Sequence, residues 1–370
     1  MVIDFQHHYI PVELAKKRGL YSATGKTMLQ ESGLPATTMH QRLYDLDLQL
    51  DDMAQAGVDL SVLSCLLGWS APLEECRFIN DDLAAIQKKY PRRFVGLAQA
   101  PILDGQAALA ELRRAINDLG LRGMTITSQV NGLPLDSPKL YDFYETACAL
   151  DVVIFVHPAL VPTGYEHLKD YDLPRVLGRE VDLTVGTARL IAGGIFDRFP
   201  NLKIVMAHFG GGIAAVKDRL IGKGYRFGTL QKPFADYYDS IYFDMAGFEG
   251  GVVALNCALQ GIWPERLVFA SDYPQDFPGS TRRPAKHERI EKLYRCGVPA
   301  AARWGEPGKD PGRHRSGVIE ARLVLLTPGY SCLYSISPIR KLPVLFTVRR
   351  WVWLNWLPHS PACCRAWTPP

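Results

Sequence analysis

The feature that most constrains the fold is a series of eight short apolar runs, rich in β-branched residues and bounded by turn residues. They occupy residues 2–5, 60–65, 94–100, 122–127, 152–156, 203–207, 240–246 and 266–271. Segments of helical length and period separate most of them and close on Gly, Asp or Pro. Apolar strands joined by helices indicate a parallel sheet covered on both faces. Eight such units predict an α/β fold, the (β/α)₈ TIM barrel of the metal-dependent hydrolase type, with a doubly wound open sheet as the alternative.

Polar residues follow four of these runs, at the end where a barrel of this kind carries its chemistry. They are Gln6, His7 and His8 after the first run, His157 after the fifth, His208 after the sixth and Asp272 after the eighth. Residues two apart in a strand face the same side, so Gln6 and His8 should enter the barrel mouth while His7 turns away. Each residue alone could be an ordinary hydrogen-bonded loop residue. Together, imidazole nitrogens and a carboxylate oxygen favour a divalent ion such as Zn²⁺ or Mn²⁺.

Charge and cysteine content narrow the class of protein. Residues 283–370 hold 15 of the 42 Lys and Arg but only 5 of the 38 Asp and Glu. Residues 1–282 therefore contain 27 Lys and Arg and 33 Asp and Glu. This mildly acidic body argues against nucleic acid as a partner. No basic segment precedes an apolar one at the start, so a cleaved signal is not expected. Cys65, Cys76, Cys148 and Cys257 are scattered without a CxxC pair, as expected of reduced thiols in a cytoplasmic enzyme.

Four stretches together resemble the amidohydrolase-related metal-dependent family that includes aminocarboxymuconate semialdehyde decarboxylase and γ-resorcylate decarboxylase. They are "IDFQHHYIP" (3–11), "VVIFVHPA" (152–159), "ARLIAGGIFDRFPNLKIVMAHFGGG" (188–212) and "LVFASDYP" (267–274), within a resemblance that runs from Met1 to about Pro278. In that family the first strand supplies two metal ligands in an HxH or ExH pattern, and a His and an Asp follow strands five and eight. The resemblance therefore implies metal ligation by Gln6, His8, His157 and Asp272. It also implies catalytic roles for His208, as a base or hydrogen-bond donor, and for Asp272, as a proton donor to carbon.

Gln6 departs from the family pattern, which has His or Glu at this position. A carboxamide oxygen can bind a hard cation but brings no charge. Two hypotheses follow: the ion is held more weakly than in an HxH member, or Gln6 only supports the site by hydrogen bonding. A catalytically impaired barrel that has lost its metal is a third possibility.

The resemblance implies a metal-dependent, non-oxidative decarboxylase, a carbon–carbon lyase, of an aromatic or unsaturated carboxylic acid. A hydrolase of a lactone or amide uses the same parts with water as nucleophile and is the alternative. One divalent ion, Zn²⁺ or Mn²⁺, would be the cofactor and a small carboxylic acid the substrate, in a homo-oligomer, a dimer or tetramer as relatives commonly are.

A substrate carboxylate needs a cationic partner, and Arg suits a bidentate grip. Arg219 and Arg226 are candidates, although charged residues on an amphipathic helix usually face solvent. Trp69 is either a wall of the substrate pocket or a packing residue. Other members carry Arg on the helix before strand two, where this chain has Gln49 and Asp51, so a substrate shared with the semialdehyde decarboxylase is in doubt.

After about residue 282 the resemblance fades and the composition changes. Residues 283–370 contain five of the seven Trp and four of the eight Cys. A membrane anchor is not expected, since the apolar stretch at 342–358 is shorter than the roughly 20 residues of a spanning helix and contains two adjacent Arg. With permitted codons, "KDPGRHRSGVI" (309–319) reads one base later as "KILGGTAAGL", which is similar to the family's closing helix. We therefore expect a barrel at 1–282 and a poorly ordered tail at 283–370 that was read out of frame, which the coding DNA can test.

Overall fold

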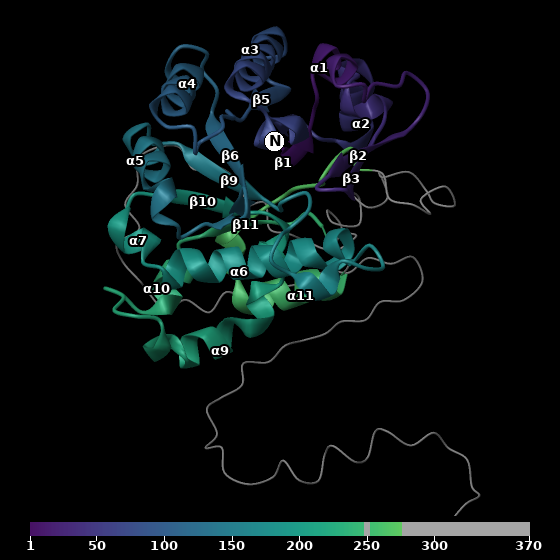
Figure 1. Ribbon diagram of the computed structural model, residues 1–370. Helices are drawn as coiled ribbons and strands as arrows, with labels where there is room; N and C mark the ends of the chain where they lie inside the picture. Colours follow the sequence, from purple (N-terminus) through teal and green to yellow (C-terminus); the bar gives the residue numbers. More distant parts are fainter. Residues whose placement is uncertain (248–251, 276–370) are drawn as a thin grey trace, which may run out of the picture. The chain divides into compact units, whose positions relative to one another are not determined.

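The computed structural model describes residues 1–247 and 252–275, and the barrel within them is built from eight parallel strands (Figure 1). The strands are β1 (Ile3–His8), β4 (Leu60–Ser64), β5 (Phe94–Gly96), β6 (Gly123–Thr127), β9 (Val153–His157), β10 (Lys203–Met206), β11 (Tyr242–Asp244) and β12 (Leu267–Val268). Each overlaps one of the eight predicted runs, and β1 and β9 continue past the ends of their runs to His8 and His157. Their pairing gives two parallel sheets, in the orders β1-β4-β5 and β12-β11-β10-β9-β6.

Two isolated bridges join these sheets into one closed barrel. Ala98, just after β5, pairs with Met124 of β6, and His7 of β1 pairs with Tyr273 after β12. At the second junction the Phe5 amide also donates to the Phe269 carbonyl at 2.9 Å. Because both edges are paired, the predicted TIM barrel is confirmed and the open doubly wound sheet is excluded.

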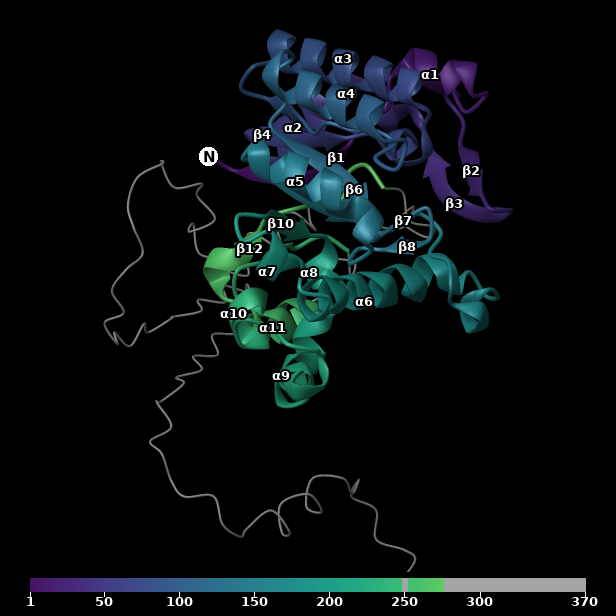
Figure 2. The same cartoon turned by 60° about the vertical axis from the view of Figure 1, so that its left-hand side comes forward.

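Helices follow the strands and cover the outer face of the barrel (Figures 1 and 2). They are α1 (Val12–Lys17), α2 (Leu46–Ala56), α3 (Leu73–Lys89), α4 (Gln106–Asn117), α5 (Tyr141–Ala149), α6 (Arg179–Ala192), α7 (Ile195–Arg198), α9 (Lys217–Gly222), α10 (Phe234–Tyr238) and α11 (Val252–Gly261). The short segment α8 (His208–Gly211) is instead a turn with non-helical backbone angles. The Asp45 side chain caps α2 by accepting from the amides of Asp47 and Leu48, and Gly57 ends it in a left-handed conformation. These are the local signals that set the ends of such a helix.

The core fills both the barrel and the layer beneath the helices. In α4, Ala108, Leu109, Leu112 and Ala115 are buried, a spacing that gives one apolar face to the strands. Inside the barrel the rings of Phe5 and Phe155 meet edge to face with centroids 5.6 Å apart. The interior is therefore packed, and the space for chemistry is left at the carboxyl rim.

Two antiparallel hairpins interrupt the repeating pattern. The first joins β2 (Thr27–Glu31) to β3 (Leu34–Met39) through Ser32 and Gly33, which both have positive φ. The second joins β7 (Gln129–Val130) to β8 (Leu133–Pro134). From the first hairpin, the Thr37 hydroxyl donates to Gln275 Oε1 at 3.1 Å, which brings β3 close to the segment that carries Asp272.

In the described part of the chain, no helix combines the length and apolar character needed to cross a membrane. The tail at 283–370 and the out-of-frame hypothesis lie outside the described residues, so both stay predictions.

Candidate active site

Strand β1 delivers Gln6 and His8 to the barrel mouth. Asp4 pairs with Ser61 but His7 pairs with Leu63, so β1 contains one extra residue between them, a β-bulge. Gln6 and His8 are both 0% exposed. The bulge also brings Asp4 and His7 to one face, with His7 Nδ1 3.2 Å from Asp4 Oδ2. His7 therefore points away from the mouth, as expected.

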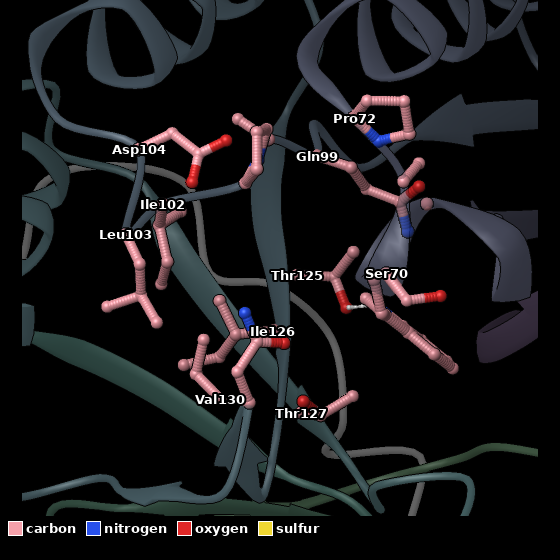
Figure 3. Close-up of a pocket in the computed structure, with 16 residues that line it drawn as sticks. Ser70, Pro72, Gln99, Ile102, Leu103, Asp104, Thr125, Ile126, Thr127 and Val130 are labelled. Atoms are coloured by element: carbon pink, nitrogen blue, oxygen red, sulfur yellow. Dashed lines mark hydrogen bonds between the residues drawn. The ribbon is translucent and has the colours of Figure 1, made fainter. Parts of the chain in front are cut away.

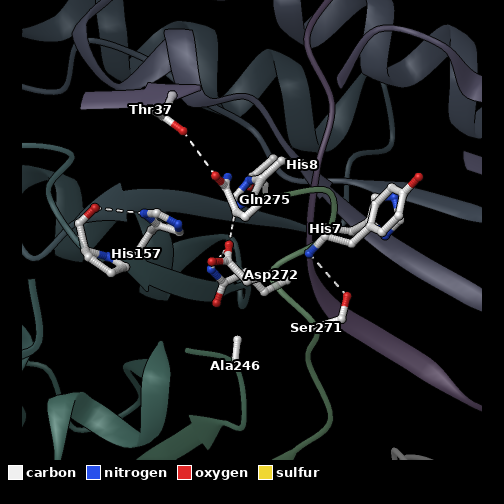
Figure 4. Close-up of polar contacts among 12 residues, drawn as sticks. His7, His8, Thr37, His157, Ala246, Ser271, Asp272 and Gln275 are labelled. Carbon is white, nitrogen blue, oxygen red and sulfur yellow. Dashed lines mark hydrogen bonds and ion pairs between the residues drawn. The ribbon is translucent and has the colours of Figure 1, made fainter. Parts of the chain in front are cut away.

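Three of the predicted ligands converge on one point (Figure 4). The candidate ligand atoms of His8, His157 and Asp272 all lie within 4.8 Å of one another. His8 Nε2 is 2.8 Å from Asp272 Oδ1, and the Gln6 amide nitrogen donates to the same oxygen at 2.7 Å. Residues from β1, from β9 and from the segment after β12 thus meet at one rim, as the strand-end argument predicted.

The donor set fits a divalent cation. His157 Nδ1 lies 2.8 Å from the Pro158 carbonyl, which fixes the tautomer and leaves Nε2 as a lone-pair donor. That Nε2 and Gln6 Oε1 are buried and have no hydrogen-bond partner in the described residues. Burial, reinforced by the charge of His8, lowers the pKa of His157 well below its usual value, so the ring is neutral, as a metal ligand must be.

Asp272 supplies the negative charge of the cluster. Burial alone would raise its pKa, but the hydrogen bond with His8 and the positive charges of His8 and His208 outweigh burial and lower the pKa far below the usual value. The carboxylate is therefore ionised and can balance part of the charge of a cation bound at the cluster.

His208 lies beside the cluster and is held on three sides. Its Nε2 is 3.3 Å from Gln6 Nε2 and 4.0 Å from Asp272 Oδ2. Its Nδ1 is 2.8 Å from Glu180 Oε1, and its backbone amide donates to Asp244 Oδ1 at 2.7 Å. Burial lowers the pKa of His208, but the Glu180 carboxylate more than compensates and raises it to about 9. His208 is therefore a protonated group facing Asp272.

The sequence analysis missed Glu180 and Asp244. Asp244 ends the seventh strand, so the strand-end rule that selected Asp272 would also have selected it. Glu180 lies in the first turn of α6, after a loop that follows β9, where no periodicity marks it as part of the site.

The turn after β10 requires its glycines. Five consecutive residues, 208–212, have positive φ, from 53° at His208 to 93° at Gly212. A Cβ on Gly211 would stand 1.9 Å from the Glu180 carbonyl oxygen. These glycines therefore allow a tight turn whose backbone approaches that of α6 closely.

Of the predicted substrate-binding residues, the structure brings Trp69 to the site. Its ring stacks on that of His157, with centroids 4.2 Å apart and planes at 27°, and its Nε1 donates to Thr125 Oγ1 at 3.3 Å. Arg219 lies instead on the exposed helix α9, and Arg226 lies in the exposed turn after it, where it packs over the Tyr225 ring at 5.6 Å. Their contacts in this chain do not support binding of a substrate carboxylate, and that role stays a prediction.

A different cationic side chain, that of Arg179, interacts with Asp272 of the cluster. Arg179, at the start of α6, donates to the carbonyls of Ala36 and Leu160. Burial lowers its pKa and the charge of Asp272 opposes that effect, so the two groups interact electrostatically.

Several of the curated relatives of this chain are decarboxylases by name. The 2-amino-3-carboxymuconate-6-semialdehyde decarboxylase of Dictyostelium discoideum is 30% identical over 226 residues, which is 56% of this chain and 63% of that protein. The chain thus spans less than two thirds of this relative. The gamma-resorcylate decarboxylase of a Polaromonas species is 28% identical over 282 residues, 68% of this chain and 85% of that protein.

Solved structures agree in fold. A 5-carboxyvanillate decarboxylase from Sphingomonas paucimobilis has a TM-score of 0.65 and 26% identity, and the match covers 80% of this chain and 97% of that one. A dihydroxybenzoic acid decarboxylase from Polaromonas, solved with bound manganese, has a TM-score of 0.61 and 24% identity over 78% of this chain and 93% of that one.

The family profile described as amidohydrolase matches residues 3–303, a range that includes every residue of the cluster. The chain therefore belongs to the amidohydrolase family.

Proposed function

We propose that the chain is a metal-dependent, non-oxidative decarboxylase of an aromatic or unsaturated carboxylic acid. The observation that carries this proposal is the convergence of His8, His157 and Asp272 on one point, with His208 4.0 Å from Asp272. The relatives named above are decarboxylases by name, which favours this reaction over hydrolysis of a lactone or amide.

His8, His157 and Asp272 would hold one divalent ion, Mn²⁺ or Zn²⁺. Gln6 would add its amide oxygen, which is buried and unpartnered in the described residues. When bound, such an ion acts as a Lewis acid that binds the substrate carboxylate and a neighbouring oxygen. Manganese suits a site that mixes imidazole with carboxylate and amide oxygens.

Side chains of the site then supply the proton that the reaction needs. Decarboxylation replaces a carboxylate on carbon with hydrogen, so one proton must reach that carbon. His208 Nε2 lies 4.0 Å from Asp272 Oδ2, so the protonated imidazole would supply this proton to the substrate carbon while the ionised Asp272 holds it in position. Trp69, stacked on His157, offers a flat wall for a planar substrate.

The full chain loaded with Mn²⁺ tests this proposal. We expect CO₂ release from 2,6-dihydroxybenzoate or a related acid, followed by ultraviolet absorbance, and loss of that activity on metal removal. The variant H157N should lose both metal and activity, whereas H167N, on an exposed turn, should keep both. Metal binding with lactone or amide hydrolysis but without CO₂ release would assign the chain to the hydrolases, and neither metal nor turnover would indicate an impaired barrel.

We also propose that the protein is a cytoplasmic homo-oligomer, a dimer or tetramer. Cys65, Cys76, Cys148 and Cys257 are all free, which fits a reducing compartment. Light scattering coupled to size-exclusion chromatography measures the assembly, and a monomer at micromolar concentration would contradict this proposal.

A further inference from the structure

His7, the middle residue of the motif "QHH", takes no part in the candidate metal cluster, yet it is 1% exposed. Its Nδ1 lies 3.2 Å from Asp4 Oδ2, and its Nε2 lies 3.3 Å from Gln49 Oε1. Its ring also stacks on that of Tyr273, with centroids 4.5 Å apart and planes at 28°. The imidazole is therefore fixed in place, and its contacts lead to the residues beside Asp272.

Asp4, which is 2% exposed, binds the residue that precedes Asp272 (Figure 4). Its Oδ1 accepts from the Ser271 amide at 2.9 Å, and its Oδ2 accepts from the Ser271 hydroxyl at 2.5 Å. Ser271 Oγ in turn accepts from the Tyr273 amide at 3.2 Å. A single buried carboxylate thus fixes, directly or through one hydroxyl, the residues on both sides of Asp272.

Tyr273 is held at two further points. Its hydroxyl donates to Asp52 Oδ2 at 2.5 Å, and its carbonyl accepts from the His8 amide at 2.7 Å. The His8 carbonyl accepts from Gln49 Nε2 at 3.1 Å. The network of hydrogen bonds therefore reaches the backbone of two candidate ligands, His8 and Asp272.

Asp272 has a backbone conformation that needs such support. Its φ is 55°, in the left-handed region that residues other than glycine rarely adopt. A conformation of this kind persists only where the surrounding contacts hold it. The hydrogen bonds at Ser271 and the ring stack at Tyr273 are such contacts, and they act on the two residues next to the ligand carboxylate.

We propose that Asp4 and His7 are positioning residues for Asp272, and that they hold its neighbours so that the carboxylate stays at the point where a cation binds. Partners of this kind, outside the ligand set, change metal affinity by about ten- to a hundredfold when they are removed. The inference rests on the proposed function, because it takes Asp272 as a metal ligand. It gives a role to His7, which points away from the barrel mouth.

A second buried carboxylate provides the matched control. Glu111 is 2% exposed and accepts from Asn80 Nδ2 and from Arg114 Nε, both at 2.8 Å. Asn80 also donates to the carbonyl of Gln99, which lines a cavity of about 350 Å³ between the segments after β4, β5 and β6 (Figure 3). None of the lining residues, all of them in the described ranges, belongs to the candidate metal cluster. The Glu111 network therefore holds a wall that is not part of the cluster.

Titration calorimetry of Mn²⁺ into the metal-free full chain tests the proposal and does not require turnover. We expect D4A to weaken Mn²⁺ binding by about tenfold or more, and D4N, which keeps an oxygen for the Ser271 amide, to recover part of that loss. H7A should weaken binding in the same way, whereas H7F keeps a ring against Tyr273 and should retain more of the affinity. E111Q should lower the melting temperature and leave the Mn²⁺ affinity unchanged.

The variant S271A keeps the test decisive if D4A does not fold. It removes the hydroxyl that joins Asp4 to the Tyr273 amide and leaves Asp4 and His7 in place. We expect Mn²⁺ binding about threefold weaker than in the wild type, with little further loss when S271A is added to D4N, because both changes break the same path.

The outcomes separate this inference from the proposed function. Wild-type Mn²⁺ affinity in D4A, H7A and S271A would overturn the inference and leave the proposed function intact, even if these variants melt at lower temperatures as E111Q does. Weaker Mn²⁺ binding in these variants, with no CO₂ release by the wild type, would support the positioning role and reject the decarboxylase. If the wild type itself binds no Mn²⁺, both proposals fail.

Discussion

Gln6 is the residue that most affects how tightly a cation is held. Its amide nitrogen donates to Asp272 Oδ1 at 2.7 Å, and its amide oxygen has no partner in the described residues. A Glu in its place would put a second carboxylate against Asp272, which is repulsive until a cation lies between them. We therefore expect Q6E to bind Mn²⁺ about tenfold more tightly and to melt at a lower temperature when metal-free.

Titration calorimetry and thermal melting of metal-free and loaded protein measure these two effects. The control Q30E adds the same charge on the exposed strand β2 and should change neither. Unchanged Mn²⁺ affinity in Q6E would show that Gln6 is not a ligand and acts only through hydrogen bonding.

Glu180 is the residue that we expect to orient His208. Its Oε1 lies 2.8 Å from His208 Nδ1, which directs Nε2 toward Asp272. E180A should lower kcat about a hundredfold with little change in KM or metal content, because the proton carrier is no longer held in place. E180Q keeps an acceptor oxygen and should recover part of that loss.

Steady-state kinetics on Mn²⁺-loaded protein measure separately how kcat and KM change in these variants. E166A, an exposed carboxylate in the same connection between β9 and α6, is the matched control and should behave like the wild type. A rise in KM with an unchanged kcat would instead place Glu180 in substrate binding.

The prediction from the sequence selected residues at the ends of four strands, but it omitted Asp244 at the end of the seventh strand and Glu180 in a helix. His157 and Asp272 could be predicted because strand ends of one barrel share a rim. Glu180 could not, since its position depends on the path of the loop before α6. Arg219 was chosen for its charge alone, and its exposed position on α9 follows from helix packing that charge does not determine.

At the level of elements, the turn between β10 and α9 shows how backbone geometry sets the site. Gly211 and Gly212 both have positive φ, at 69° and 93°, yet only Gly211 is packed against α6. A Cβ on Gly212 meets nothing within 4 Å. We expect G212A to cost about 1 kcal/mol of unfolding free energy from backbone strain, and G211A about 3 kcal/mol or more because strain and a backbone clash add.

Urea denaturation of both variants tests this difference. Because the clash in G211A is with the carbonyl of Glu180, this variant should also displace the Glu180 carboxylate from His208 and lose activity under conditions where it is still folded. Equal stability of the two variants would mean that the turn and α6 are not in direct contact.

Some secondary-structure elements could be predicted from the sequence and others could not. The eight strands contain apolar runs rich in β-branched residues because both of their faces are covered, so their pattern was visible in the sequence. The hairpin of β2 and β3 was not predicted, since no residue of β2 is buried and polar and apolar residues alternate weakly in β3. Its turn at Ser32 and Gly33 is the one local signal.

For the whole molecule, the candidate ligands come from the first and the last parts of the barrel along the chain, as well as from its middle. His8 lies in the first strand, His157 in the fifth, and Asp272 after the last. A cation bound by all three would tie β1 to the segment after β12, where the barrel closes through the His7–Tyr273 bridge. Metal binding should therefore stabilise the entire barrel rather than one loop.

This coupling predicts the size of a thermal shift. A ligand that binds only the folded state at a hundred times its Kd adds about 2.7 kcal/mol of stability, which for a domain of this size raises Tm by about 5 °C or more. We expect Mn²⁺ to produce such a shift in scanning calorimetry and a chelator to reverse it. The rise in Tm between metal-free and Mn²⁺-loaded protein should be mostly lost in H157N, whereas H167N should show the same rise as the wild type. An equal shift in H157N would mean that the ion binds elsewhere, because His157 supplies an unpartnered nitrogen at the point where the three ligands meet.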